Sequence, residues 1–396
     1  MKHLRISLIY SLFLFAAALL NAAEIVRGPY VEAPQNNTAT INWQVSEASP
    51  SWIEYGPQGK CSQIMALSSS KYNHTLPLYG LIPNTKFCYT IYVENSTKTG
   101  VQEGVSGEFS TLYTPERKIL NFLVIGNTSD ASEQSTNEIK DKIAAAMESY
   151  DADFIIHTGD IVSTGANEDS GREFFTPFRG PISKAALLIA LGEDEYGPNR
   201  ADKSGRGFLK ANYRKIHTMP WSRGTPSYYY VDTANARIIF IDTNNVYGVI
   251  DAPALTAKST QYEWLRSALS SAGSDKWKIV VMHHPVYSSG KEEDKLSSFL
   301  APLFEAYRVN LVIQGHQGAY ERTKPIVKGA PARSGPIYVT VGGGGKLFEP
   351  MEYQNEWGAK YYETPHFAQI SIVDRKLSLR VYTHENKKID SLDLYF

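Results

Sequence analysis

The sequence predicts a multidomain chain in which an all-β sandwich precedes a larger domain of alternating strands and helices. The length of 396 residues, with 42% hydrophobic and 20% charged residues, suits two or three globular domains and excludes a disordered chain. Up to about residue 114, apolar and polar positions alternate with period two. Later segments alternate short apolar runs with helical patterns, which is typical of an α/β domain.

Residues 1–23 have the pattern of a cleaved secretory signal peptide. Lys2 and Arg5 precede an apolar stretch at 6–20, and small residues follow at 21–23. An uncleaved N-terminal anchor is the alternative, although an apolar stretch of about 15 residues is short for a spanning helix. No later segment has the length and apolar character of a membrane span. We therefore expect a secreted or periplasmic protein.

The charge balance bears on which partners the protein binds, and the cysteine content bears on which residues could bind a metal. Forty Lys and Arg against 41 Asp and Glu give a net charge of −1, so nothing favours a nucleic acid partner. Cys61 and Cys88 are the only cysteines, and an exported protein can join them in a disulfide. Two separate packed thiols are the alternative. Any metal ligands must therefore be sought among histidines and carboxylates.

The first domain is predicted at residues 24–114. Residues 39–45 and 87–94 alternate apolar and polar side chains, and Gly and Pro turns separate the candidate strands. This pattern indicates an antiparallel sandwich of about 90 residues. The stretch at 80–87 resembles the corner before the sixth strand of fibronectin type III domains. The resemblance implies a fibronectin type III-like domain.

The second domain is predicted at residues 117–396. It opens with an apolar run at 119–125, a helical pattern at 133–150 and a second apolar run at 154–157, which together indicate a β-α-β unit with a buried sheet. The remaining elements follow the same alternation and end in strands. They are strands at 185–191, 238–242, 279–282 and 311–314, helices at 260–271 and 295–307, and final strands at 367–373 and 377–383.

Polar segments stand where five of these strands end, at 126–127, 159–160, 192–195, 283–284 and 315–316. Ligands of open α/β sheets gather outside the carboxyl ends of strands. Histidines and carboxylates from several loops make a suitable set of ligands for a divalent metal. Each also has a structural explanation: Asp160 as a turn cap, residues 193–195 as a solvated acidic run, and each histidine as a packed core residue.

The order of these segments resembles the motif series of the purple acid phosphatases, within the calcineurin-like metallophosphoesterases. The motifs are Gly159-Asp160, residues 192–195, Val280–His283 and Gly315–Arg322. The likeness covers nearly the whole mature chain, because that family also carries a fibronectin-like domain before the catalytic one. It implies an α/β/β/α metallophosphoesterase sandwich that hydrolyses phosphoric esters with two metals.

The metal ligands depart from the family in one half of the site. The resemblance implies a ferric ion held by a shared Asp and by three residues whose positions are here Asn127, Ser163 and Gly318. We expect that half to be empty, with Asp130 as the nearby carboxylate that could substitute. The positions of the second metal all retain residues capable of binding one divalent transition metal (Zn, Mn or Fe). They are Asp160, Glu193, His283 and His316.

Two functional hypotheses follow. The first is a weak metal-dependent phosphoric monoester hydrolase acting on a phosphate ester, in which Asp194 stands at the position of the family's catalytic histidine. The second is a catalytically inactive secreted pseudophosphatase that serves as a binding or scaffold protein. Ligand loss and the acidic run at 193–195, which would repel a phosphate dianion, favour the second. The sequence leaves the substrate and the oligomeric state open.

Overall fold

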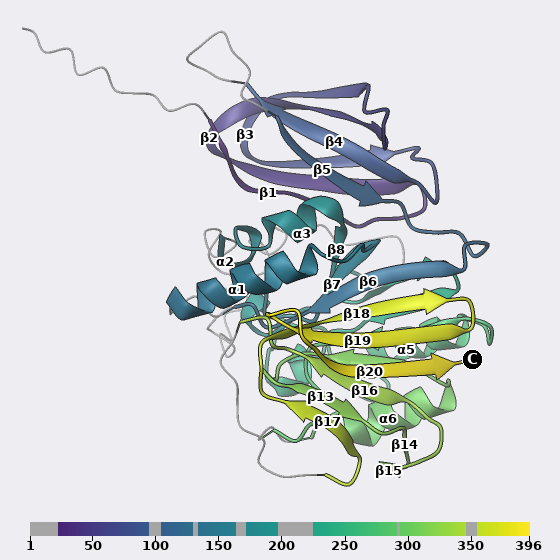
Figure 1. Cartoon of the computed structure of the whole chain (residues 1–396). Helices are drawn as coiled ribbons and strands as arrows, with labels where there is room; N and C mark the ends of the chain where they lie inside the picture. The colour runs from purple at the N-terminus through teal and green to yellow at the C-terminus, as the bar shows by residue number, and fades with distance from the viewer. Residues whose placement is uncertain are drawn as a thin grey trace, which may run out of the picture.

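The computed structural model describes residues 23–94, 104–129, 134–163, 172–196, 225–290, 294–345 and 355–396. Residues 1–22 of the predicted signal peptide, and Asp130, lie outside the described residues. In the described part, two large β-sheets form the body of the molecule and helices flank them (Figure 1). Within that part, no helix has both the length and the apolar character needed to cross a bilayer.

The N-terminal strands form the predicted β-sandwich, and β2 (Thr38–Pro57) is much longer than the alternating stretch predicted at 39–45. β2 pairs with β1 (Ile25–Glu32) along its first half and with β4 (Lys86–Val93) along its second half. β3 (Gln63–Tyr79) pairs with β2 along both halves. The register of β2 against β3 shifts between Gln44 and Ser51, where β2 passes from pairing with β1 to pairing with β4. The strands are β1 (Ile25–Glu32), β2 (Thr38–Pro57), β3 (Gln63–Tyr79), β4 (Lys86–Val93) and β5 (Val105–Ser110).

Cys61 and Cys88 are joined in a disulfide, with their Cα atoms 5.9 Å apart. The bond ties the segment after β2 to β4, and the sequence had left this pairing open. It closes a loop with a sequence separation of 27 residues. A covalent closure of that kind restricts the unfolded chain and so stabilises the sandwich.

The second region has the predicted α/β/β/α layering. Its first sheet contains β6 (Ile119–Ile125), β7 (Phe154–His157), β8 (Ala186–Ile189), β18 (His366–Val373), β19 (Lys376–Thr383) and β20 (Lys388–Tyr395). The second contains β9 (Tyr229–Thr233), β10 (Ala236–Phe240), β11 (Trp277–Val281), β12 (Leu311–Gln314), β13 (Tyr320–Thr323), β16 (Ile337–Val341) and β17 (Gly358–Tyr362). A separate ribbon pairs β14 (Ile326–Val327) with β15 (Ala330–Pro331).

Helices cover the outer faces of the two sheets (Figure 1). Alternate residues of β10 face two different cores. Ile238 and Phe240 belong to the core shared with the first sheet. Ile239, between them, belongs to the core that includes Leu265 of α5 and Leu300 of α6. The helices are α1 (Gln134–Met147), α2 (Arg172–Phe175) and α3 (Arg179–Lys184) on the first sheet, and α5 (Thr260–Ser270) and α6 (Ser297–Ala306) on the second.

The N-terminal sandwich continues the first sheet rather than standing apart from it. Glu32 of β1 pairs with Leu187 of β8, and α3 packs against both β1 and β8. The ring centroids of Tyr30 in β1 and Phe175 in α2 lie 4.3 Å apart. One buried core therefore runs through both regions. The domain limits at 24–114 and 117–396 stay a prediction.

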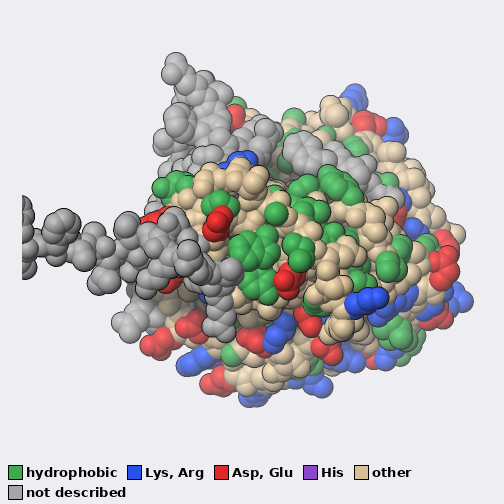
Figure 2. Space-filling view, turned by 90° about the horizontal axis from the view of Figure 1, so that it is seen from above, with side chains coloured by type: hydrophobic (Ala, Val, Ile, Leu, Met, Phe, Trp, Pro, Cys, Tyr) green, Lys and Arg blue, Asp and Glu red, His purple; other side chains and the backbone are tan. Residues whose placement is uncertain are grey.

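Acidic and basic side chains are interspersed on the face at the sandwich end of the molecule, with hydrophobic side chains among them (Figure 2). The exposed large hydrophobic residues of the sandwich are Ile64, Tyr72, Tyr79 and Ile82. Because both signs are mixed among the described residues of this face, those residues form no continuous basic surface for a polyanion.

Candidate metal centre

The predicted site residues follow strands of both sheets. β6, β7 and β8 are parallel neighbours in the first sheet, and β11 and β12 are parallel neighbours in the second. Parallel strands end at the same edge of a sheet, which places their loops together. The loops after these five strands carry Asn127, Asp160, Glu193, His283 and His316.

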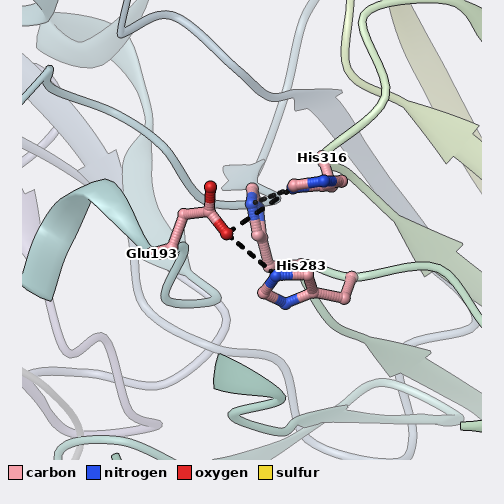
Figure 3. A group of neighbouring side chains, drawn as sticks. Glu193, His283 and His316 are labelled. Atoms are coloured by element: carbon pink, nitrogen blue, oxygen red, sulfur yellow. Dashed lines mark hydrogen bonds and ion pairs between the residues drawn. The ribbon is translucent and has the colours of Figure 1, made fainter. Parts of the chain in front are cut away.

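Three of the four predicted metal ligands converge on one another (Figure 3). Nδ1 of His316 lies 3.2 Å from Nε2 of His283 and 3.9 Å from a carboxylate oxygen of Glu193. The His283 side chain is fully buried and that of His316 is 17% exposed. The two imidazoles come from loops of the second sheet and the carboxylate from a loop of the first, so the cluster brings together loops of both sheets.

His284 also belongs to this cluster, although the sequence singled out only its neighbour His283 as a ligand. Its Nε2 lies 3.0 Å from Oε2 of Glu193. The cluster thus consists of Glu193, His283, His284 and His316. Each of these residues offers one ligand atom, and the four atoms all lie within 4.8 Å of one another.

The hydrogen bonds and spacings in this cluster suit a bound cation. Nδ1 of His283 lies 2.9 Å from the carbonyl oxygen of Thr158. A carbonyl only accepts, so Nδ1 carries a proton, and Nε2 is the nitrogen that faces the cluster and that binds a metal in the neutral imidazole. Tetrahedral zinc, with bonds of about 2.0–2.1 Å to nitrogen, sets its ligand atoms about 3.3 Å apart. The observed separations of 3.0, 3.2 and 3.9 Å bracket that value, so the residues fit a divalent transition metal.

Asp160, the fourth predicted ligand, lies beside the cluster. Its Oδ2 is 3.3 Å from Nε2 of His283, and its Oδ1 accepts the backbone N–H of Asp194 at 3.1 Å. Asp160, Glu193 and Asp194 form a second group of possible ligands whose oxygens all lie within 4.8 Å of one another. Three neighbouring carboxylates attract a cation and repel a phosphate dianion.

Glu195 holds the loops of this site in place, a role that the sequence did not reveal. Its carboxylate accepts backbone N–H groups from Gly192 at 2.6 Å, Asp160 at 2.9 Å and Ile161 at 2.7 Å. It therefore joins the loop after β7 to the loop after β8. Glu193 and Glu195 are 7% and 2% exposed, so the interpretation of this run as a solvated acidic segment is wrong for both.

The cluster shifts the pKa values of its own members in opposite directions. Burial opposes ionisation of Glu193, yet the hydrogen bond with His284 and the charges of His283 and His316 lower its pKa to about 2. Burial disfavours charged His283, but Asp160 raises the pKa of His283 to about 9. Burial prevails at His284 and lowers its pKa to about 4. Glu193 is thus an anion and His284 a neutral imidazole near pH 7, the forms that bind metals, whereas His283 is protonated and would release a proton on binding one.

Asn127, a predicted lost ligand, is bonded to the backbone of His316. Its Oδ1 accepts the His316 N–H at 3.0 Å, and its Nδ2 donates to the His316 carbonyl. Asn127 is fully buried, and both residues have left-handed backbone angles, with φ of 54° and 65°. Only an amide can donate and accept in this way, because a carboxylate has no proton to donate.

The other two lost positions offer no ligand atom directed at the cluster. Ser163 is exposed, and its hydroxyl donates to Oε1 of Glu173 at 2.6 Å while its backbone N–H binds the other carboxylate oxygen at 2.8 Å. Gly318 is buried in the turn between His316 and β13 and has no side chain.

Comparison with known proteins decides the family. The sequence profile described as calcineurin-like phosphoesterase matches residues 120–320, slightly more than half of the chain. The chain belongs to the calcineurin-like phosphoesterase family. Its site loops after β6, β7, β8, β11 and β12 all lie within the matched residues.

Curated relatives place the chain near the purple acid phosphatases of this family. Purple acid phosphatase 21 of Arabidopsis thaliana is 27% identical over 282 residues, which cover 69% of this chain and 58% of the relative. Purple acid phosphatase 18 of the same plant is 27% identical over 329 residues, covering 77% and 68%. The chain thus spans between about half and two thirds of the length of these relatives.

Solved structures show the same fold. A purple acid phosphatase, PPD1, from yellow lupin (Lupinus luteus) seeds superposes with a TM-score of 0.75 at 18% identity, covering 95% of this chain and 74% of that one. PhoD superposes with a TM-score of 0.70 at 11% identity, covering 94% and 92%. Because both matches extend over nearly the whole chain, they cover the N-terminal β-sandwich as well as the metallophosphoesterase fold.

Proposed function

We propose that this purple acid phosphatase-like metallophosphoesterase holds a single divalent transition metal (Zn, Mn or Fe) and hydrolyses phosphoric esters weakly. One contrast carries the proposal: Glu193, His283 and His316 converge, while Asn127 and Ser163 are bonded elsewhere in the protein. The leader at 1–23 and the disulfide support an exported protein, with residues 24–114 as its accessory domain.

Asp160, Glu193, His283 and His316 are the residues that the resemblance assigns to the metal. A divalent cation, when bound, polarises a phosphoryl oxygen and lowers the pKa of a bound water. Asp194 is partly exposed, and its backbone is fixed by the N–H bond to Asp160. We assign Asp194 the exchange of a proton with water or with the leaving oxygen, in place of the family's histidine.

We expect weak hydrolysis for two reasons, one concerning the lost metal ligands and the other the charge of the site. Electrostatic stabilisation of the transferring phosphoryl group is usually the largest catalytic contribution, and three ligand positions of one of the two cations are lost. In addition, the carboxylate oxygens of Asp160, Glu193 and Asp194 lie within 4.8 Å of one another, and such a group repels a phosphate dianion near the metal.

An inactive pseudophosphatase that retains a metal is the second candidate. The observation that favours it is the same group of three carboxylates, because such a group binds a cation more readily than a phosphate dianion. In that case the exported chain would act as a binding or scaffold protein.

Metal analysis paired with a phosphatase assay tests both candidates. The purified protein is dialysed, its metal content is measured by inductively coupled plasma mass spectrometry, and hydrolysis of an aryl phosphate is followed from pH 4 to 9. We expect at most one tightly bound metal per chain and turnover far below the usual enzyme range of about 1–1,000 per second. Turnover within that range would refute both candidates, whereas one metal with no turnover would select the pseudophosphatase.

A further inference from the structure

His284 is a histidine at the centre of the site that the family resemblance does not assign. It is fully buried, and its Nε2 faces the same Glu193 oxygen that lies 3.9 Å from Nδ1 of His316. Its imidazole ring lies 4.7 Å from that of His316 and 4.9 Å from that of His283, measured between centroids. Three imidazoles therefore surround one carboxylate oxygen.

We infer that His284 is a ligand of the single metal and that the protein binds it through Glu193, His283, His284 and His316. This inference rests on the proposed single-metal function and defines its ligand set. These four residues form one group, whereas Asp160 is grouped with Glu193 and Asp194. A set of three imidazoles and one carboxylate suits zinc and other borderline divalent metals.

The surroundings of His284 orient its imidazole as those of a ligand. Nδ1 lies 2.9 Å from the hydroxyl oxygen of Thr243, and the same oxygen accepts the His284 backbone N–H at 3.1 Å. Metal-binding histidines commonly use their second ring nitrogen in a hydrogen bond of this kind. The ring is also stacked on Tyr247, with centroids 3.9 Å apart and an interplanar angle of 4°. Thr243 and Tyr247 thus fix both the in-plane rotation and the tilt of the ring.

A fourth protein ligand changes what the site can do. Structural zinc sites are closed by four protein ligands, whereas catalytic zinc sites keep one position for water or substrate. With His284 bound, the position that would activate water is taken by the protein. The inferred ligand set therefore favours tight metal retention over hydrolysis.

X-ray absorption spectroscopy of the zinc-loaded full chain tests the inference without any mutation. Multiple scattering from imidazole rings counts the histidines bound to zinc. We expect three, and a count of two would overturn the role of His284 while leaving the single-metal proposal intact. Failure of the wild-type chain to retain zinc would instead refute the proposed function on which the inference rests.

Zinc affinity, measured by competition with a chromophoric chelator, supplies a second readout. Loss of one hydrogen-bonding partner behind a ligand typically costs about 10–100-fold in affinity, so loss of a ligand should exceed about 100-fold. We expect His284→Ala to show such a loss and Asp160→Asn a loss at least tenfold smaller. The reverse order would overturn the inference and favour the ligand set that contains Asp160.

Two further variants separate coordination from folding. His284→Phe keeps an aromatic ring to stack on Tyr247 but has no nitrogen, so it should fold and still lose zinc as His284→Ala does. His366→Gln is the matched control: His366 is also fully buried, its Nδ1 faces the carbonyl of Thr364, and it lies outside the cluster. Wild-type zinc affinity in His284→Phe, or an equal loss in a folded His366→Gln, would overturn the inference.

Discussion

At the predicted positions of the second metal, loops of both sheets direct imidazole and carboxylate atoms at one another, with separations of 3.2–3.9 Å. At the three positions private to the first metal, the available polar groups serve the protein instead. Asn127 is bonded to the backbone of His316, Ser163 to Glu173, and Gly318 carries no side chain. The positions that the resemblance assigns to the two metals therefore differ in what their side chains contact.

Asn127 shows this difference most clearly, because it has a structural role at a predicted ligand position. Asn127 stands where the resemblance implies an aspartate ligand, and its amide now fixes the backbone of His316 through two hydrogen bonds. His316 belongs to the retained half. Asn127 therefore helps to position a predicted ligand of the retained half, and each substitution below has a distinct expected result.

Metal retention should show the largest contrast between the two halves. His283→Ala removes a ring nitrogen from the centre of the retained cluster and should lower metal affinity by more than about 100-fold, beyond the loss expected for a residue behind a ligand. Ser163→Ala, in the altered half, should leave metal affinity unchanged. Equilibrium dialysis followed by metal analysis measures both, and equal metal content in wild type and His283→Ala would show that the retained half is misassigned.

Much of the fold follows from sequence patterns. The apolar runs at 119–125, 154–157 and 311–314 correspond to β6, β7 and β12 without any change of limits. Short apolar runs with a Gly one or two residues behind them are typical of strands that are buried on both faces. The pairing of β1 with β8 could not be predicted, since it depends on how two distant segments dock.

The site was predictable at the level of loops but not of every side chain. In a strand, consecutive residues point to opposite faces, so His284 next to His283 looks like a core residue. β11 ends at Val281, however, and beyond it both histidines reach the cluster. The bonds of Asn127 to His316, 189 residues away, and of Glu195 to three backbone groups depend on tertiary contacts that no local pattern encodes.

Restoring the altered half should have the next largest effect. The combined variant Asn127→Asp, Ser163→Tyr and Gly318→His returns the three ligand types that the family resemblance implies. We expect a second metal per chain and aryl phosphate hydrolysis raised by about 100-fold or more, because metal ions supply several kcal/mol of charge stabilisation in the transition state. Metal analysis and the rate at saturating metal measure this gain. A second metal without any gain would show that the carboxylates, rather than the missing cation, limit hydrolysis.

A smaller effect is expected from Asn127→Asp alone. The carboxylate can still accept the His316 N–H, but it cannot donate to the His316 carbonyl in this fully buried position. The free energy of unfolding should fall by about 1–3 kcal/mol, the cost of an unsatisfied buried polar group. Urea unfolding of the metal-free protein measures it, with Ser163→Ala as an exposed control expected within about 0.5 kcal/mol of wild type. An unchanged stability would mean that the carboxylate finds a partner where Asn127 found one.

The last prediction is the absence of a signal: the protein should show no visible absorption band with ferric iron. By the family resemblance, the purple colour arises from charge transfer between a tyrosinate and ferric iron, and the position of that tyrosine is here Ser163. A serine hydroxyl has no π orbital to donate from, and that of Ser163 is bonded to Glu173. The wild-type protein should therefore stay colourless when ferric iron is added, and Ser163→Tyr alone should stay colourless too, because Asn127 and Gly318 still supply no iron ligand.

Absorption spectra recorded before and after addition of ferric iron test this, with the combined variant as the positive comparison. A band in the wild type would require another tyrosine to reach the metal, and Tyr247 is the one stacked against His284 in the retained half. Loss of that band in Tyr247→Phe would then place the iron in the retained half. Its persistence would mean that the site contains a tyrosine ligand outside the cluster described here, and the contrast between the two halves would fail.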